Sequence, residues 1–270
     1  MQTTYGPNVT VERVGHVAAV TLNRPPHNFV SVALMRSLAD AFAAVDADPQ
    51  ARAIVLQADG KSFSAGADFS GPSETGSDAP AGDAPAGDAS PGATPLYAEA
   101  IRLYSARTPI VAAVQGAAIG AGLGLALVAD FRVASPEARF AANFVKLGFH
   151  PGFGITYALP RLIGEQGAAL MMLTGRRIKG EEALAWGLAD DLVPAEDLRA
   201  AAMRLASEIA ESAPLAVAAT RATLRAGLAD RIAMQTDLEN REQMILRGTE
   251  DFREGIRAVA ERRAGAFVGR

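Results

Sequence analysis

Two short runs of small residues are the strongest candidates for chemistry in this sequence. The first is KSFSAGADF at residues 61–69, and the second is QGAAIGAGLGL at residues 115–125. Each is expected to follow a strand and to lead into a helix. Small side chains let a ligand approach the main chain, and the first N–H groups of a helix have no intrahelical partner. Each run is therefore predicted to bind an anion or a carbonyl oxygen, although close packing alone would also explain either run taken singly.

Histidine offers a second kind of chemistry, because its imidazole is the side chain most easily poised as a general base near neutral pH. His150 lies in the glycine-rich run GFHPGFG at residues 148–154, where it is a candidate acid or base. The alternative is a histidine that caps a turn or packs within it. Weaker candidates are His16, His27, Tyr97, Glu99 and Tyr104.

The elements that would position these residues alternate between strands and helices. Residues 9–22 are rich in valine and threonine around a Gly-His turn and predict a hairpin. Apolar residues at helical spacing predict a helix over residues 31–48, with Ser31 as its N-cap. Short apolar strands are expected at residues 53–56, 110–114 and 130–134, and mostly helices beyond residue 159. This order indicates an α/β fold.

Composition narrows the function classes. The 270 residues contain no cysteine, so disulfides, thiolate nucleophiles and cysteine-ligated metals are excluded. A formal net charge of −4 gives no basic field for nucleic acid. The first residues lack the features of a signal peptide, and no apolar run is long enough to span a bilayer. We expect a cytoplasmic protein with no membrane or nucleic-acid partner, no metal and no tightly bound cofactor.

Residues 70–95 differ from the rest of the sequence in their composition. They contain the near-repeat DAPAG, DAPAG, DAS and almost no large apolar side chain. Such a segment buries too little to offset its ordering entropy, so it predicts a mobile acidic loop. The loop is expected either to be a tolerated insertion or to lie over a site.

Several sequence motifs taken together indicate a protein family more specifically than any one of them does alone. Residues 63–68 followed by residues 112–130 resemble the paired signatures of the enoyl-CoA hydratase/isomerase (crotonase) superfamily. Similar matches are VTLNRP at residues 20–25, ARF at 138–140, LTG at 173–175, AWGL at 185–188 and EDFREG at 250–255. The resemblance covers roughly residues 10–268, apart from the acidic loop.

The resemblance implies an architecture. It implies a core of repeated β-β-α units over residues 1–198, wound as a superhelix. It also implies a C-terminal helical region over residues 199–270 through which subunits form a homotrimer or a hexamer. The implied ligand is an acyl-CoA, with coenzyme A present as part of the substrate.

The resemblance also implies site residues. The backbone N–H groups of Ala67 and Ala121 would form an oxyanion hole for the thioester carbonyl and so stabilise an enolate. Further residues are expected to bind substrate: Lys61, Ala65 and Asp68 along the CoA edge, Phe267 toward the CoA of a neighbouring subunit, and also Gly120 and Phe144.

The sequence departs from the family pattern where acids are expected. Hydratases of the family carry two glutamates, which here fall on Gly124 and Phe144. Other branches place an aspartate after a proline, and here Pro151 is followed by Gly152. Positioned acid–base groups each contribute roughly 10²- to 10⁴-fold. Hydration of a double bond is therefore expected to be severely impaired.

Three alternatives stay open. The chain could be a non-catalytic acyl-CoA-binding member, or a decarboxylase or isomerase of CoA thioesters. The third is an NAD-dependent short-chain dehydrogenase, because residues 116–122 have the spacing GxxxGxG after an apolar strand. Against it, no tyrosine is followed four residues later by the lysine that such enzymes use.

Overall fold

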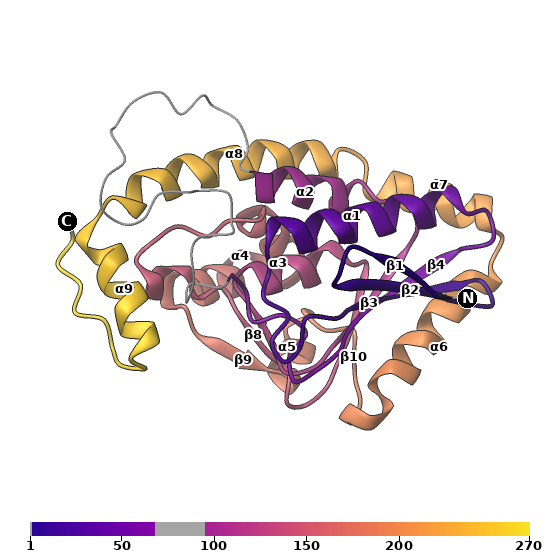
Figure 1. The fold of residues 1–270 in the computed structure, drawn as a ribbon, viewed down its shortest axis with the longest axis horizontal. Coiled ribbons are helices and arrows are strands. Elements are labelled where there is room, and N and C mark those ends of the chain that lie inside the picture. Colours follow the sequence, from indigo (N-terminus) through magenta and orange to yellow (C-terminus); the bar gives the residue numbers. More distant parts are fainter. Residues whose placement is uncertain (1, 68–94) are drawn as a thin grey trace.

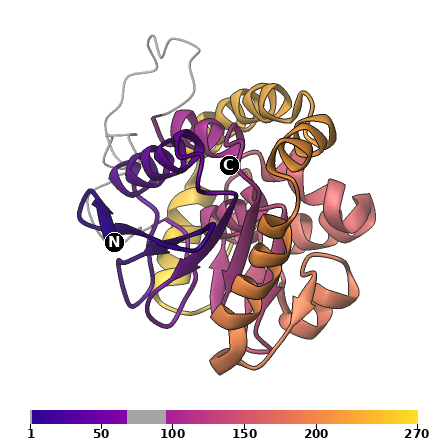
Figure 2. The same ribbon diagram turned by 90° about the vertical axis from the view of Figure 1, so that its right-hand side faces the viewer.

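Two β-sheets form the centre of the molecule, with helices around them (Figures 1 and 2). The structure, a computed structural model, describes residues 2–67 and 95–270. In sheet order, the larger sheet contains β1 (Gln2–Tyr5), β2 (Val9–Val14), β3 (Val17–Leu22), β4 (Ala53–Ala58), β5 (Ile110–Val114), β7 (Phe131–Ala134) and β10 (Asp191–Leu192). The smaller sheet contains β6 (Ala117–Ile119), β8 (Arg139–Ala141) and β9 (Arg177–Lys179).

Along the chain, the helices lie between and after these strands. Those of the first two thirds are α1 (Val32–Ala47), α2 (Pro95–Tyr104), α3 (Ala121–Val128), α4 (Ile155–Thr174) and α5 (Gly180–Ala185). Those of the last third are α6 (Leu198–Glu211), α7 (Pro214–Leu224), α8 (Leu228–Arg247) and α9 (Glu250–Ala260). Short 3₁₀ turns are η1 (Asn143–Leu147) and η2 (Ala195–Asp197). Within the described residues no helix has both the length and the apolar character needed to cross a membrane.

Local sequence signals explain the first elements. Strands β2 and β3 form the predicted antiparallel hairpin, in which Val14 pairs with Val17 and Gly15 takes a positive φ of 60°. Helix α1 begins as predicted, because the Ser31 hydroxyl accepts a hydrogen bond of 3.2 Å from the N–H of Leu34. That bond satisfies one of the helix's unpaired donors.

The central strands of the larger sheet are buried on both faces. In β4, Ile54 and Leu56 face the main core beneath α1 and α3, whereas Ala53 and Val55 face α6. The same alternation of faces continues in β5. Because successive side chains of a strand point to opposite faces, a strand covered on both sides reads as a continuous apolar run. This is why residues 53–56 and 110–114 predict strands without showing any alternation.

Two β-β-α units follow one another through the centre of the chain. In β5-β6-α3 and in β7-β8-η1-α4, the first strand joins the larger sheet and the second joins the smaller one. This confirms the predicted crotonase-like α/β fold. Strand β1 and the short strands β6, β8, β9 and β10 were not predicted, and β6 lies in the run for which only a turn and a helix were expected. The four short strands are two or three residues long and are held by distant partners, so no local pattern marks them.

The C-terminal third packs on the rest of the molecule. Helix α8 runs beside α2 and α4, and α9 lies against η1 (Figure 1). Helix α6 covers one face of the larger sheet through Leu198, Ala202 and Ala206. The division between residues 198 and 199 falls at the start of α6 and stays a prediction. The acidic run lies outside the described residues, except for Pro95, which begins α2.

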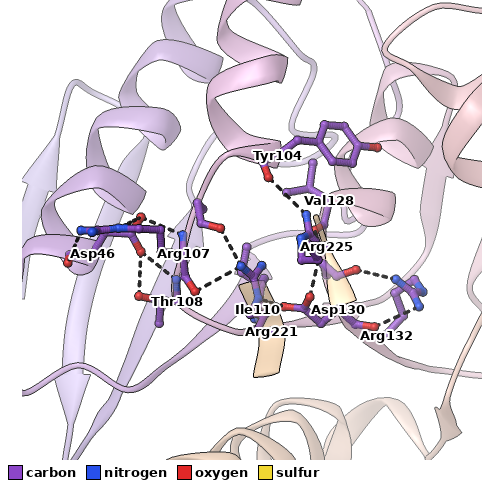
Figure 3. A network of polar contacts seen from close by, with 12 residues as sticks. Asp46, Tyr104, Arg107, Thr108, Ile110, Val128, Asp130, Arg132, Arg221 and Arg225 are labelled. Carbon is purple, nitrogen blue, oxygen red and sulfur yellow. Dashed lines mark hydrogen bonds and ion pairs between the residues drawn. The ribbon is translucent and has the colours of Figure 1, made fainter. Parts of the chain in front are cut away.

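A charged network ties α7 to the larger sheet (Figure 3). The carboxylate of Asp130 accepts hydrogen bonds from the N–H of Ile110 at 2.8 Å, from Nε of Arg221 at 2.8 Å and from Nη1 of Arg225 at 2.9 Å. Arg221 also donates to the carbonyl of Ala106 at 2.6 Å. Since the Arg221 side chain is only 9% exposed, its charge depends on Asp130 for compensation.

Candidate functional site

The two small-residue runs lie side by side. The N–H of Ser64 donates to the carbonyl of Ala117 at 2.9 Å, and the N–H of Ile119 donates back to Ser64 at 3.1 Å. Ser64 and Ala118 form a parallel bridge. Because the runs are parallel and in register, Gly66-Ala67 and Gly120-Ala121 end at the same place.

Glycine is required where the two runs come closest. Gly66 has a φ of 91°, and a Cβ atom placed on it would lie 2.6 Å from the carbonyl oxygen of Ile119. The same atom would lie 3.8 Å from the amide nitrogen of Ala121. A side chain at position 66 would therefore push the two runs apart.

The directions of the two amides follow from the hydrogen bonds of their peptide units. The carbonyl of Gly66 accepts from the N–H of Val30 at 2.9 Å, and the carbonyl of Gly120 accepts from the N–H of Gly124 at 3.1 Å. In a trans peptide the N–H points opposite to the C=O. The N–H of Ala67 thus points away from Val30, and that of Ala121 points out of the start of α3, where it has no intrahelical acceptor.

Both alanines line one cavity of about 340 Å³. Most of its wall is apolar, and four phenylalanines contribute to it: Phe29, Phe144, Phe149 and Phe153. Helix α9 closes one side through Ile256 and Val259. A cavity of this size, mainly apolar with a few polar groups, is the usual form of a small-molecule site.

Three further predicted residues lie in this wall. Ala65, Gly120 and Phe144 line the cavity together with Ala67 and Ala121. Lys61 is exposed at the start of the first run and is not part of the wall. Asp68 lies outside the described residues.

Two other predicted residues, His150 and Phe267, are not among the residues that line the cavity. The Nδ1 atom of His150 is 2.7 Å from the carbonyl of Pro151, and the His150 carbonyl faces Gln243. Phe267 is 44% exposed in the segment after α9. The acid–base role of His150 and the CoA contact of Phe267 stay predictions.

Of the weaker candidates, only Tyr97 reaches the cavity. Glu99 is buried and pairs with Arg36 at 3.0 Å and with Arg102 at 2.6 Å. The carbonyl of His27 accepts from the N–H of Ala65 at 2.9 Å, so His27 supports the first run through its backbone.

The two positions without acids are filled by packing. A Cβ atom placed on Gly124 would lie 2.5 Å from Cδ1 of Phe153, whose ring is 1% exposed. Phe153 therefore occupies the space into which a longer side chain at position 124 would extend. At the second position the Phe144 ring lies 5.5 Å from that of Phe149 in an edge-on contact.

Gln243 of α8 is a polar residue of the cavity wall that was not predicted from the sequence. The hydroxyl of Tyr97 donates to Oε1 of Gln243 at 2.7 Å, and Nε2 of Gln243 donates to the carbonyl of His150 at 2.8 Å. Burial raises the pKa of Tyr97 well above its ordinary value, so its hydroxyl stays neutral. Arg247, one turn beyond Gln243, also lines the cavity. Polar residues at positions 239, 243 and 247 are four residues apart, and this spacing could have predicted a polar face on the helix.

Glu239 continues this polar face of α8 behind the cavity. It is fully buried, and its carboxylate accepts hydrogen bonds from the N–H groups of Gly154 at 2.7 Å and Thr156 at 3.0 Å. These donors belong to the start of α4, which Glu239 caps from a distance. Burial raises the pKa of Glu239 to about 7, against the opposing effect of these hydrogen bonds.

Comparison with known proteins agrees with this geometry. The model of the family described as enoyl-CoA hydratase/isomerase matches residues 12–270. The chain belongs to the enoyl-CoA hydratase/isomerase family. Membership in this family leaves the short-chain dehydrogenase alternative without support.

Relatives within the family cover nearly the whole chain. An (E)-benzylidenesuccinyl-CoA hydratase of Thauera aromatica is 37% identical over 97% of this chain and 99% of its own. A 2,3-dehydroadipyl-CoA hydratase of Escherichia coli K12 is 35% identical over 96% and 98%. The crystal structure of an enoyl-CoA hydratase/isomerase from Pseudoalteromonas atlantica has a TM-score of 0.83 at 29% identity, over 97% and 100% of the two chains.

Proposed function

We propose that this family member binds acyl-CoA thioesters in the 340 Å³ cavity and holds the thioester oxygen with the N–H groups of Ala67 and Ala121. The observation that carries the proposal is the parallel pairing of the two small-residue runs, which ends in two amides at one cavity wall. Donors already aimed at a developing oxyanion stabilise an enolate without reorganisation, and one such donor is typically worth about 2.7–4 kcal/mol.

Relatives named as hydratases and a dehydratase of CoA thioesters favour a lyase reaction for this chain as well. Gly124 and Phe144 oppose efficient hydration, because neither can move a proton. Reactions that need only the oxyanion donors are the second candidate, such as decarboxylation of a malonyl-type thioester, in which departing CO₂ leaves the enolate. The packing of Phe153 against Gly124 favours this second candidate.

The donor at position 121 can be removed by proline, which lacks an N–H. Ala121 is the first residue of α3, where proline is tolerated. We expect Ala121→Pro to lower turnover of the best CoA ester by about 10²- to 10³-fold. Ala121→Ser keeps the N–H and is the matched control. Equal activities of the two variants, both folded by circular dichroism, would contradict the oxyanion role of this amide.

The reaction itself is tested by incubating the protein with trans-2-enoyl-CoAs and malonyl-type CoA esters of several lengths. Consumption of the ester is followed by chromatography, and binding is followed by calorimetry. Rapid hydration would contradict the expectation drawn from Gly124 and Phe144. Tight binding without any turnover would favour a non-catalytic acyl-CoA-binding protein.

We also infer that the chain associates with copies of itself into a trimer or a hexamer. Large apolar side chains are exposed along α7 and α8, including Leu215 at 85%, Leu224 at 73%, Met234 at 68% and Ile245 at 67%. An exposed apolar surface of this extent is typical of an interface between proteins.

A further inference from the structure

Tyr97 is the one side chain with a transferable proton among the described residues that form the cavity wall. The other polar side chains of this wall are Asn143, Gln243 and Arg247. Side-chain amides do not titrate, and a guanidinium keeps its proton in proteins. Glu239 is not among the lining residues, and its carboxylate binds the start of α4. Of the described wall residues, the phenol of Tyr97 is therefore the group that can pass a proton to a ligand.

Packing and hydrogen bonding hold this phenol at a defined place. A Cβ atom placed on Gly152 would lie 1.9 Å from the hydroxyl oxygen of Tyr97. The hydroxyl donates to Oε1 of Gln243 at 2.7 Å, and both Gly152 and Gln243 line the cavity. The hydroxyl therefore lies between two residues of the wall. The missing acid at position 152 and the hydroxyl beside it belong to one packing arrangement, because a side chain there would displace the phenol.

Gln243 determines where the hydroxyl hydrogen points in the free protein. Its Nε2 donates to the carbonyl of His150 at 2.8 Å, so its Oε1 is the atom that faces Tyr97. An amide oxygen only accepts, which makes the phenol the donor. Rotation about the Cζ–Oη bond can turn the same hydrogen toward a ligand in the cavity. Because burial raises the pKa of Tyr97, the phenol carries its proton at neutral pH and is suited to act as an acid.

We propose that Tyr97 is the catalytic acid of this site and protonates the α-carbon of a thioester enolate. The proposal rests on the proposed function, because it takes Ala67 and Ala121 to hold the enolate oxygen in the same cavity. With a malonyl-type ester, the bond between the α-carbon and the carboxylate breaks, CO₂ leaves, and the electron pair forms the enolate. The O–H bond of Tyr97 then breaks as a C–H bond forms at the α-carbon. The phenolate regains a proton from water.

A phenol that stays protonated suits this reaction better than hydration. A thioester enolate is a stronger base than a phenolate, so a neutral phenol can protonate it. In hydration the attacking water must lose a proton, which requires a base. The Tyr97 phenol already carries its proton and cannot be that base. Tyr97 therefore favours decarboxylation, the second candidate reaction, over addition of water.

The competing role for Tyr97 is structural, in which its hydroxyl only ties α2 to Gln243 of α8. The two roles differ in what they change. Loss of a structural contact alters the cavity and so weakens the binding of every acyl-CoA. Loss of a proton donor leaves binding intact, lowers kcat and removes control over the face of the α-carbon that receives the proton.

The test follows decarboxylation of methylmalonyl-, ethylmalonyl- and butylmalonyl-CoA in D₂O. We expect the wild-type protein to place deuterium on one face of the α-carbon, since a fixed donor reaches only one face. Tyr97→Phe should lower kcat by about 10²- to 10⁴-fold, with KM within a few-fold, and its remaining product should carry deuterium on both faces. NMR of a chiral derivative of the product acid measures the placement.

Tyr104→Phe is the matched control. Tyr104 lies on the same helix and is buried, but it does not line the cavity, and its hydroxyl has no hydrogen-bond partner among the described residues. Its removal should leave kcat, KM and the deuterium placement unchanged. Binding of pentanoyl-CoA, which cannot lose CO₂, is measured by calorimetry for all three proteins and should be equal within a few-fold.

The outcomes are distinguishable. Unchanged kcat together with unchanged placement in Tyr97→Phe would overturn the inference, and so would deuterium on both faces in the wild-type product. Weaker binding of pentanoyl-CoA by Tyr97→Phe, in proportion to the loss of activity, would assign the hydroxyl to structure and also overturn it. Binding of the esters without loss of CO₂ would overturn it and leave the proposed function standing. If no CoA ester binds, the proposed function fails and this inference fails with it.

Discussion

At the scale of single residues, one contact accounts for the small residue at position 124. The Phe153 ring lies where a side chain at position 124 would extend, and Phe153 itself adopts a φ of 68°, which is unfavourable for a residue with a side chain. The absence of an acid at position 124 is thus matched by the packing around it. Restoring a glutamate there would require a change at position 153 as well.

The coupling of Gly124 and Phe153 can be measured by a double-mutant cycle. We expect Gly124→Ala to destabilise the wild-type protein by about 1–3 kcal/mol, because the added methyl group overpacks the core. In a Phe153→Ala background the same change should cost much less, since the ring is gone. The free energy of unfolding in urea is the measurement. Gly167→Ala, whose added Cβ would make only ordinary contacts at 3.4 Å, is the control and should be neutral or stabilising. Additive costs in the cycle would show that the two positions are independent.

Glu239 gives the stability a predictable dependence on pH. Its pKa is raised to about 7 in the folded protein, so folding favours the protonated form. Its contribution to the free energy of unfolding is fully present below the unfolded pKa of about 4.5 and is lost as the pH rises through about 7. We expect Glu239→Gln to flatten the decline in stability over this interval, measured by urea unfolding at several pH values. Asp237→Asn, at an exposed position of the same helix, should leave the slope unchanged. A slope that survives Glu239→Gln would assign the pH dependence to other groups.

At the scale of elements, α7 and α8 are attached to the α/β core by polar contacts as well as by packing. Asp130 joins the start of β5 to two arginines at the end of α7 (Figure 3). Glu239 joins α8 to the start of α4. Both carboxylates satisfy main-chain N–H groups that the secondary structure leaves unpaired, so they position elements that are far apart in the sequence.

Removal of the Asp130 charge should loosen this attachment. We expect Asp130→Asn to lower the free energy of unfolding by about 3–5 kcal/mol, because it leaves the buried Arg221 uncompensated. Denaturant unfolding followed by circular dichroism is the measurement. The matched control is Asp59→Asn, which breaks the exposed ion pair with Arg199 and should cost only about 0–1 kcal/mol. Equal costs for the two substitutions would show that burial of Arg221 has no energetic consequence.

At the scale of the whole molecule, α8 separates two environments. Its inward face is polar and lines the cavity, whereas its outward face carries exposed Met234, Leu238 and Ile245. Spacings of four and seven residues place these three side chains on one face. A second copy of the chain would cover this face, in agreement with the proposed trimer or hexamer.

The assembly can be tested at the outward face. We expect the double substitution Met234→Glu and Ile245→Glu to shift the protein to a smaller species in analytical ultracentrifugation, because charges on both copies would be desolvated and repel each other. The helical content should not change. Val14→Glu, at an exposed apolar position of strand β2, is the control and should leave the sedimentation unchanged. An unchanged species in the double variant would place the interface elsewhere or show that the chain is a monomer.

Much of the fold is predictable from short stretches of sequence. The Ser31 cap, the turn at Gly15 and the buried strands at residues 53–56 and 110–114 depend on neighbours within a few residues, so local patterns are enough. The two small-residue runs were also identified as candidate sites, because small residues before a helix imply accessible N–H groups.

The tertiary structure determined the features that depend on contacts between residues far apart in the sequence. The short strands β6, β9 and β10 exist only because remote strands pair with them. The contact between Gly124 and Phe153, and the entry of Gln243 and Arg247 into the cavity wall, join segments that the sequence keeps roughly 30 to 180 residues apart. The sequence alone determined which backbone N–H groups are accessible to a ligand, because small residues before a helix are a local feature of the chain. Packing determined the shape and charge of the cavity they face, because a wall made from several helices is fixed by long-range contacts alone.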